Sequence, residues 1–480
     1  MKNEMEELKT LASKLPNQKF LEETFDYLKK IEGPMTFIIS STFPTIDKIE
    51  LSLQKGKRCF DFKTSSVNIV KEFATYEKDG YGFFKPIKLN NRNIEWIIPR
   101  SVAVLKMDIA TDLDMSGELW EVESNFDKNK KKYFRLVIPN DYDPNHEHSA
   151  YLKSEMFAVG DTIKFDGFIE YHCNENLFNL FDYKIDKNGY LFIDSMTPML
   201  YDEFEKSIGD TMYSLGVISG CIFRNEMYIL QSENNDFKII SGFHYRKIED
   251  NVISGMEIVS VRLLREVTKD KKIEGYISKE VFSNMVTKAR NDNRFLRALK
   301  IITECNIYPL EMRASAYSIA LETIKNIIIE ENESKVNPFK KKNFASETIS
   351  KLKEIIIPLD NFYFNNKEAI LNKIEQLNQV TNKDSFKLAF ALCGFQLTKI
   401  DEEALLKRND FLHGRIPFEG AEESKQNQEL KFITYKLHFL VTTLIMKYSK
   451  YCGYLKNNPK VFSVFAEGNK EINEPLFRNV

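Results

Sequence analysis

The sequence predicts an α+β protein in which a β-rich, sandwich-like N-terminal region precedes an all-α helical bundle. Three observations support this prediction. Between about residues 33 and 270, apolar residues alternate or gather in short runs, and turn signals such as Asp-Gly and Asn-Gly separate the runs. From about residue 278 the apolar residues recur with helical spacing instead. Polar residues suited to N-caps precede several of these helical stretches.

Residues 1–32 are the first predicted unit, a short helical segment. Leu8, Leu11 and Leu15 recur at near-helical spacing, and the pattern continues to about residue 31. Gly33 and Pro34 then end it.

Residues 33–270 are predicted to form the β-rich region. Short runs rich in Phe, Ile, Val and Tyr, such as 133–138, 177–183 and 258–264, are typical of strands. One helix is expected to interrupt them around residues 199–208. We expect this region to sense a trigger or to restrain the bundle that follows it.

Residues 278–480 are predicted to form the helical bundle. Helices are expected over 310–329, 346–356, 367–380, 384–397 and 423–451. The expected apolar stripe of the first of these consists of Met312, Ala316, Ile319, Ile324 and Ile327. The last one carries apolar residues at alternating spacings of three and four, which is typical of a bundle seam: Leu430, Ile433, Leu437, Leu440 and Leu444.

The overall charge excludes a uniformly basic nucleic-acid binder. The 480 residues include 68 Lys and Arg against 70 Asp and Glu, a net charge of −2. An apolar fraction of 43% with 29% charged residues is typical of an ordered globular protein rather than a disordered one. A local basic site remains compatible with this balance, and because Arg is scarce, each Arg at a candidate site is informative.

The sequence indicates a cytoplasmic protein without a membrane span. The charged start lacks the apolar core of a secretory signal, and no run of 18 apolar residues occurs. The six Cys lie far apart without a C-x-x-C pair, so neither a zinc site nor a disulfide scaffold is expected. We expect no metal and no cofactor.

The segment from Lys407 to Arg415 carries the most informative residues. Thr398 and Asp401 predict a capping box, so a helix begins there and runs for about four turns. Gly414 then ends it. On that helix Asn409 and His413 lie four residues apart on one face, and the long side chain of Arg408 can reach the same side.

This set of residue types suits cleavage of RNA without a metal. A histidine at the C-terminal end of a helix tends to have a raised pKa and can transfer protons near neutral pH. Arg can hold a phosphate through two parallel hydrogen bonds, and Asn can orient the histidine or bind a ribose or phosphate oxygen. Together they can deprotonate a ribose 2′-OH, support the charge at phosphorus and protonate the leaving oxygen. One histidine cannot easily do both proton transfers, whereas a twofold dimer would bring two copies together.

The run from Arg408 to Gly414 resembles the R-N-x-x-x-H signature of HEPN-superfamily ribonucleases. The Gly after His413, the loop that follows and the long last helix are most similar to the ApeA-type branch. There, a HEPN domain follows a mostly β region in a bacterial anti-phage abortive-infection protein. The resemblance implies a metal-independent endoribonuclease that acts as a homodimer on RNA, tRNA included. It implies Arg408 and His413 as the catalytic pair, Asn409 as the polar third residue, and a phage-derived trigger at the N-terminal region.

Neighbouring basic residues are candidates for contacts with RNA phosphates. These candidates are Lys407, Arg415 and Lys436. Arg408 and His413 are expected to be partly exposed, whereas His438 on the last helix is expected to be a packing or surface histidine.

Two alternatives belong to other classes of protein. One is a non-catalytic HEPN-like bundle that dimerises and binds RNA or a nucleotide. The other is a β-sandwich ligand-binding protein with a helical oligomerisation domain.

Residues 112–123 have the spacing of an EF-hand calcium loop, but the β-like flanks favour a hairpin instead.

Overall fold

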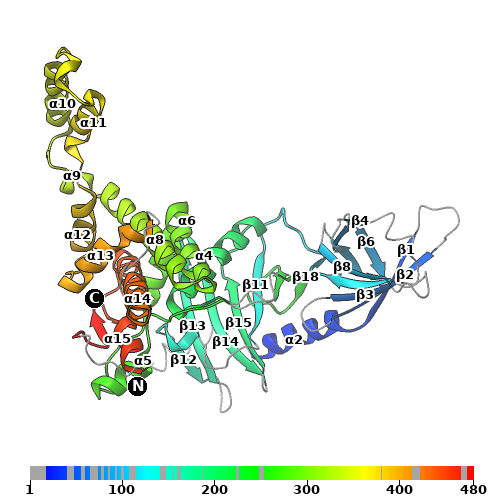
Figure 1. The fold of residues 1–480 in the computed structure, drawn as a ribbon. Coiled ribbons are helices and arrows are strands. Elements are labelled where there is room, and N and C mark those ends of the chain that lie inside the picture. Colours follow the sequence, from blue (N-terminus) through cyan, green and yellow to red (C-terminus); the bar gives the residue numbers. More distant parts are fainter. Residues whose placement is uncertain are drawn as a thin grey trace. The chain divides into compact units, whose positions relative to one another are not determined.

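The computed structural model describes residues 18–40, 48–55, 60–64, 74–76, 81–84, 87–91, 94–98, 102–107, 115–140, 148–153, 155–158, 164–185, 188–222, 226–247, 253–379, 381–412, 422–465 and 473–480. The chain divides into two compact units. Unit 1 comprises Met1–Leu263 and Glu274–Arg290, and unit 2 comprises Leu264–Ile273 and Asn291–Val480. Unit 1 holds most of the strands and unit 2 is mostly helical, so the predicted α+β class and the order of its parts are confirmed (Figure 1).

The first strands of unit 1 pair in a closed ring. They are β1 (Met35–Ser40), β2 (Lys48–Lys55), β3 (Phe60–Thr64), β6 (Ile87–Asn91), β7 (Ile94–Ile98), β9 (Met115–Leu119) and β10 (Glu121–Ser124). The antiparallel pairings run β1–β2–β3–β9, and β10 follows β9 after a single residue and pairs with β7. β7 pairs with β6 and β6 with β1, which closes the ring. Since β9 and β10 occupy Met115–Ser124, much of the EF-hand-like segment is strand, as its flanks predicted.

Three short strands extend this part of the sheet from β9. They are β4 (Ala74–Tyr76), β5 (Tyr81–Phe84) and β8 (Val102–Met107), paired in the order β9–β8–β5–β4. β8 and β9 are consecutive and antiparallel, with Met107 opposite Met115. Asp112 and Asp114 of the EF-hand-like segment lie outside the described residues.

The remaining strands of unit 1 continue the antiparallel sheet from β10. They are β11 (Tyr133–Asn140), β12 (Glu155–Ala158), β13 (Lys164–Cys173), β14 (Asn176–Ile185), β15 (Asn188–Ser195), β17 (Glu226–Ser232) and β18 (Ile240–Lys247). Their order is β10–β18–β17–β11–β15–β14–β13–β12.

Helices cover both faces of these central strands. Phe134 of β11 contacts Phe204 of α4 (Tyr201–Ser219) with ring centroids 5.1 Å apart. The next residue, Arg135, points to the opposite face, where it donates to Thr24 of α2 (Gln18–Glu32) and to both oxygens of Asp194. Successive side chains of a strand alternate between faces, so one β11 strand packs against both helices. The helix predicted around residues 199–208 is confirmed as α4, and it continues to Ser219.

Two segments near residue 270 are placed differently from the expected ranges. The run 258–264, expected as a strand, contributes to helix α5 (Val261–Thr268), because a short apolar run fits either structure. Helix α6 (Lys279–Asn291) belongs largely to unit 1 although it follows residue 278. Its Phe282 lies against Tyr171 of β13, with ring centroids 5.1 Å apart.

Unit 2 is built around helix α8 (Leu310–Glu331). It packs against α7 (Asn293–Glu304), α12 (Asn382–Leu392), α13 (Lys399–Leu412) and α14 (Glu423–Tyr448). The expected helices at 310–329 and 423–451 are confirmed, and the predicted seam of α14 from Leu430 to Leu444 is buried. Of the stripe predicted on α8, Ile324 and Ile327 are buried as expected, whereas Met312 and Ile319 are exposed. The buried face is Ala314, Tyr317, Leu321, Ile324 and Ile328, which has equally good helical spacing.

A small helical arm extends from this bundle (Figure 1). It comprises α9 (Glu333–Val336), α10 (Lys342–Ile356) and α11 (Lys367–Glu375). The shorter elements of the chain are β16 (Cys221–Ile222), β19 (Ile253–Ser254), β20 (Tyr454–Lys456), α15 (Asn458–Phe465), β21 (Phe477–Asn479) and the 3₁₀ turns His148–Ala150, Cys305–Ile307, Asn361–Tyr363 and Gln376–Asn378. Among the described helices, none is long and apolar enough to cross a membrane.

The predicted capping box begins helix α13. The Thr398 N–H donates to the Asp401 carboxylate at 2.8 Å, and the Asp401 N–H donates to the Thr398 hydroxyl at 3.2 Å. These bonds satisfy two of the N–H groups that a helix start leaves without partners. The motif therefore fixes where α13 begins and which residues its later turns present.

Asp401 also belongs to a buried charge cluster of four residues: Asp401, Lys436, Glu474 and Arg478. Asp401 accepts from Lys436 at 2.8 Å and from Arg478 at 2.9 Å, and Glu474 accepts from Lys436 with both oxygens. Two cations and two anions thus balance inside the unit. Burial pushes the pKa of Asp401 upward, but Arg478 and Lys436 outweigh it, so that pKa lies below its usual value.

We predict that Asp401→Asn lowers the free energy of unfolding of unit 2 by roughly 3–5 kcal/mol, because it leaves buried cations underpaired. The depressed pKa means that the wild-type stabilisation is complete above the unfolded value of about 4 and is lost as the pH falls through the folded value. The difference in the free energy of unfolding between the wild type and Asp401→Asn should therefore become smaller as the pH falls.

Denaturant unfolding followed by helical circular dichroism measures this effect. Glu347→Gln is the control, since its i,i+4 pair with Lys351 is exposed and should change stability by at most about 1 kcal/mol. Equal unfolding midpoints for Asp401→Asn and wild type at neutral pH would show that the cluster does not hold α13.

Candidate functional site

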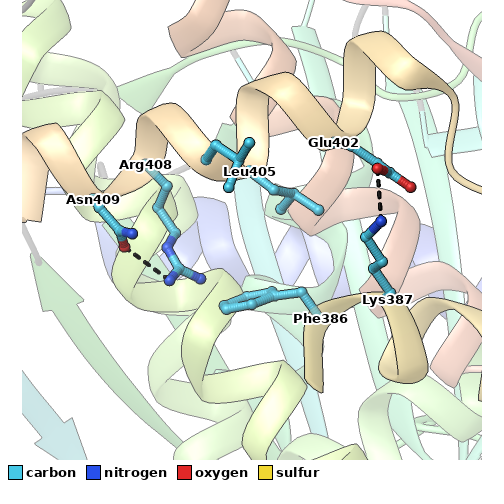
Figure 2. A pocket seen from close by; sticks show the side chains of 7 residues that line it. Phe386, Lys387, Glu402, Leu405, Arg408 and Asn409 are labelled. Atoms are coloured by element: carbon cyan, nitrogen blue, oxygen red, sulfur yellow. Dashed lines mark hydrogen bonds and ion pairs between the residues drawn. The ribbon is translucent and has the colours of Figure 1, made fainter. Parts of the chain in front are cut away.

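The candidate site lies where helix α13 passes over helix α12. Arg408 and Asn409 are in the last turns of α13, and His413 comes directly after Leu412, its last residue. Phe386 and Lys387 approach from α12, whose N-terminus is capped by the Thr381 hydroxyl accepting from the Asp384 N–H. Figure 2 shows the side chains of the two helices pointing toward one another.

The guanidinium group of Arg408 is buried and only partly hydrogen-bonded. The residue is 3% exposed, which contradicts the expectation of a partly exposed side chain. Its Cζ lies 3.8 Å from the centre of the Phe386 ring, and its Nη2 donates to the Asn409 side-chain oxygen at 3.0 Å. Nε and Nη1 have no hydrogen-bond partner among the described residues. Buried donors without acceptors are costly, so an anion that accepts from Nε or Nη1 would stabilise this guanidinium.

A second buried cation reinforces the positive potential. The Nζ of Lys325 on α8 lies 4.8 Å from the centre of the same Phe386 ring. The acidic group near both cations is Glu322, whose carboxylate lies 4.0 Å from the Lys325 Nζ. Burial lowers the pKa of Arg408 and that of Lys325, while Glu322 opposes the change in both. Arg keeps its proton under such a shift, so the group stays cationic.

A groove of about 140 Å³ opens beside Arg408. Its lining comes from α12 and α13 and consists of Phe386, Lys387, Glu402, Leu405, Leu406, Arg408 and Asn409. Arg408 and Asn409 lie at one end, and Lys387 and Glu402 at the other (Figure 2). Three of the seven lining residues are apolar and four are polar or charged, a mixture that suits a ligand with an apolar part and polar ends.

The other predicted site residues are placed in three ways. Asn409 is exposed beside Arg408, and Lys407 is exposed on a second hollow between α13 and α14. His413 and Arg415 lie outside the described residues. Lys436, expected to contact an RNA phosphate, is fully buried in the charge cluster and bound to two carboxylates. We therefore assign Lys436 to the support of α13 and not to RNA contact.

His438 is a packing residue, as expected. It is 2% exposed, and its ring lies 5.1 Å from that of Tyr317. Burial lowers its pKa to about 3, so its imidazole is neutral near pH 7. Among the described residues no group of His, Cys, Asp and Glu side chains is arranged to hold a metal ion.

Phe386, Lys325 and Lys387 were not identified from the sequence. They lie between 21 and 83 residues before Arg408, on other helices, and no short motif joins them to it. The helical periodicity places Phe386 on the inner face of α12, where an aromatic residue is ordinarily read as core.

Comparison of the chain with protein-family models, with curated protein sequences and with solved structures gave no match. The candidate site therefore rests on its own geometry and on the sequence motif.

We predict that inorganic phosphate raises the melting temperature of the wild-type protein and that Arg408→Gln abolishes the rise. An anion bound only by the folded state stabilises it by about 2.7 kcal/mol at 100 times its dissociation constant. Melting is measured in phosphate and in chloride of equal ionic strength.

Arg297→Gln is the matched control for this experiment, because Arg297 is an exposed residue of α7 in the same unit. It should keep the full phosphate effect. A phosphate-dependent rise of equal size in Arg408→Gln and wild type would show that the Arg408 guanidinium does not bind the anion.

Proposed function

We propose that the protein is a metal-independent endoribonuclease. The observation that carries this proposal is the buried guanidinium of Arg408, whose Nε and Nη1 lack acceptors in the described part of the chain and which lines a groove. It belongs to the Arg408-Asn409-x-x-x-His413 motif, so a phosphate-binding group and a proton-transfer group are five residues apart along the chain.

Each residue of the motif has a separate role in the proposed reaction. Arg408 binds the phosphate that is cut and balances the charge that develops at phosphorus. Asn409 accepts a hydrogen bond from the Arg408 Nη2 and so keeps Nε and Nη1 directed to the substrate. His413 transfers protons as a general base or acid.

The reaction needs no atom beyond the RNA and these side chains. A base removes the proton of the ribose 2′-OH, and the oxygen attacks the adjacent phosphorus. The bond from phosphorus to the 5′-oxygen breaks, and an acid protonates that oxygen. The products are a 2′,3′-cyclic phosphate and a 5′-hydroxyl end. We propose that a second copy of the chain supplies the second histidine, as a twofold homodimer allows.

The resemblance of the motif to HEPN ribonucleases also leads us to propose a biological setting. We propose that the enzyme cuts cellular RNA, tRNA included, in anti-phage abortive infection in the cytoplasm. The β-rich region is then the part that receives the trigger. The division of the chain into two compact units is compatible with separate sensing and cutting parts.

The second candidate function is a non-catalytic module that binds RNA or a nucleotide. The same buried Arg408 favours it, because an anion site does not by itself require catalysis. Cleavage that depends on His413 separates the two functions.

We predict that Arg408→Gln and His413→Ala each lower the rate of RNA cleavage by at least about a hundredfold, because each removes a group needed in the transition state. Asn409→Ala should have a smaller effect, since Arg408 remains but is less well oriented. Cleavage should persist in a chelator and stop when the 2′-OH at the cut site is replaced by hydrogen.

Purified wild-type and variant proteins are compared on total tRNA, and circular dichroism checks that each is folded. Arg297→Gln is again the control and should cut at the wild-type rate. Wild-type rates in His413→Ala would exclude the proposed mechanism, and phosphate binding without cleavage by any of the proteins would favour the binding module.

A further inference from the structure

The groove between α12 and α13 continues well beyond Arg408. Glu402 and Arg408 are six residues apart on α13, which places them about 9 Å apart along the helix axis. A phosphate bound by Arg408 would therefore leave most of the groove unfilled. The length that remains is comparable with one nucleotide.

The middle of the groove is apolar. Leu405 and Leu406 of α13 and Phe386 of α12 line it. Leu406 is 53% exposed, although leucine is usually buried in a helical bundle. An apolar surface of this kind suits the flat face of a base better than it suits a second phosphate.

The far end of the groove offers one donor and one acceptor. The Lys387 Nζ lies 2.7 Å from the Glu402 Oε2, and the two side chains are 44% and 41% exposed. An exposed ion pair contributes little to stability, so both groups can exchange partners at little cost. A nucleobase edge carries donors and acceptors of the same kind.

We propose that this groove is a nucleotide subsite for single-stranded RNA, and the proposal rests on the proposed function. The phosphate accepts a hydrogen bond from Nε or Nη1 of Arg408, the base lies on Leu405 and Leu406, and the base edge meets Lys387 and Glu402. A base stacked in a duplex cannot enter such a groove, so the substrate is an unpaired segment, such as a loop.

The first test measures which base lies next to the cut. Wild-type protein, Glu402→Gln and Glu403→Gln are given the same pool of unstructured RNA, and the cut sites are sequenced. Glu402→Gln replaces an acceptor-only group by one that also donates, so it should change the ratio of preferred to disfavoured bases by about fivefold or more.

Glu403→Gln is a closely matched control. It removes the same charge from the adjacent residue, but Glu403 lines the second hollow, on the other side of α13. It should keep the wild-type preference. Equal base preferences in all three proteins would overturn the proposed contact with the base edge.

The second test does not depend on catalysis, so it separates this inference from the proposed function. Binding of a nucleoside 5′-monophosphate and of inorganic phosphate is measured by calorimetry on the wild-type protein and on Leu406→Ser. The wild type should bind the nucleotide at least about tenfold more tightly than phosphate, and Leu406→Ser should remove most of that difference. Phosphate affinity itself should be unchanged.

Ile355→Ser on α10 controls for the loss of an exposed apolar side chain, because Ile355 is 61% exposed and does not line the groove. If the nucleotide binds no more tightly than phosphate, the subsite is refuted even when the enzyme cuts RNA. If the nucleotide binds as expected but no RNA is cut, the subsite stands and the ribonuclease is refuted.

Discussion

The site depends on one constraint, the burial of a guanidinium group whose donors are not all met by the protein. Removing a charged group from water is unfavourable unless hydrogen bonds replace those to water. Arg408 donates to Asn409, and the ring of Phe386 covers its face, yet Nε and Nη1 remain without acceptors in the described part of the chain. Lys325 adds positive charge nearby. A natural resolution of this imbalance is an anion that enters the groove, and RNA provides one at every nucleotide.

Helix α13 carries both Arg408, whose hydrogen-bond donors are not all met, and Asp401, whose charge is balanced inside the unit. At its first turn Asp401 is buried between Lys436 and Arg478, and Glu474 completes a cluster of two cations and two anions. The capping box fixes the same turn. Seven residues later the helix presents Arg408, so the cluster holds the position from which Arg408 reaches the groove. The charge of Asp401 is balanced by its neighbours, whereas two donors of Arg408 on the same helix lack acceptors in the described part of the chain. This difference supports a role for Arg408 in binding an anion.

Much of the architecture could be predicted from the sequence, because its signals are local. The change from β-like runs to helical periodicity, the α8 and α14 helices and the capping box at Thr398 depend on residues close in the chain. Features set by contacts between distant segments could not be predicted. Lys436 resembles any surface Lys until Asp401 and Glu474 are brought to it, and the phase of the α8 stripe is decided by which face meets α14. The burial of Arg408, which was expected to be partly exposed, depends on Phe386, and no motif links Phe386 to it.

The central claim is that Arg408 holds the RNA phosphate through one of its two donors Nε and Nη1. A crystal structure of the full chain with a short RNA whose cut-site 2′-OH is replaced by hydrogen tests it most directly. The account predicts a phosphate oxygen within about 3 Å of Arg408 Nε or Nη1, with the adjacent base in the groove between α12 and α13. RNA bound elsewhere on the chain, with no phosphate oxygen near the Nε or Nη1 of Arg408, would contradict it.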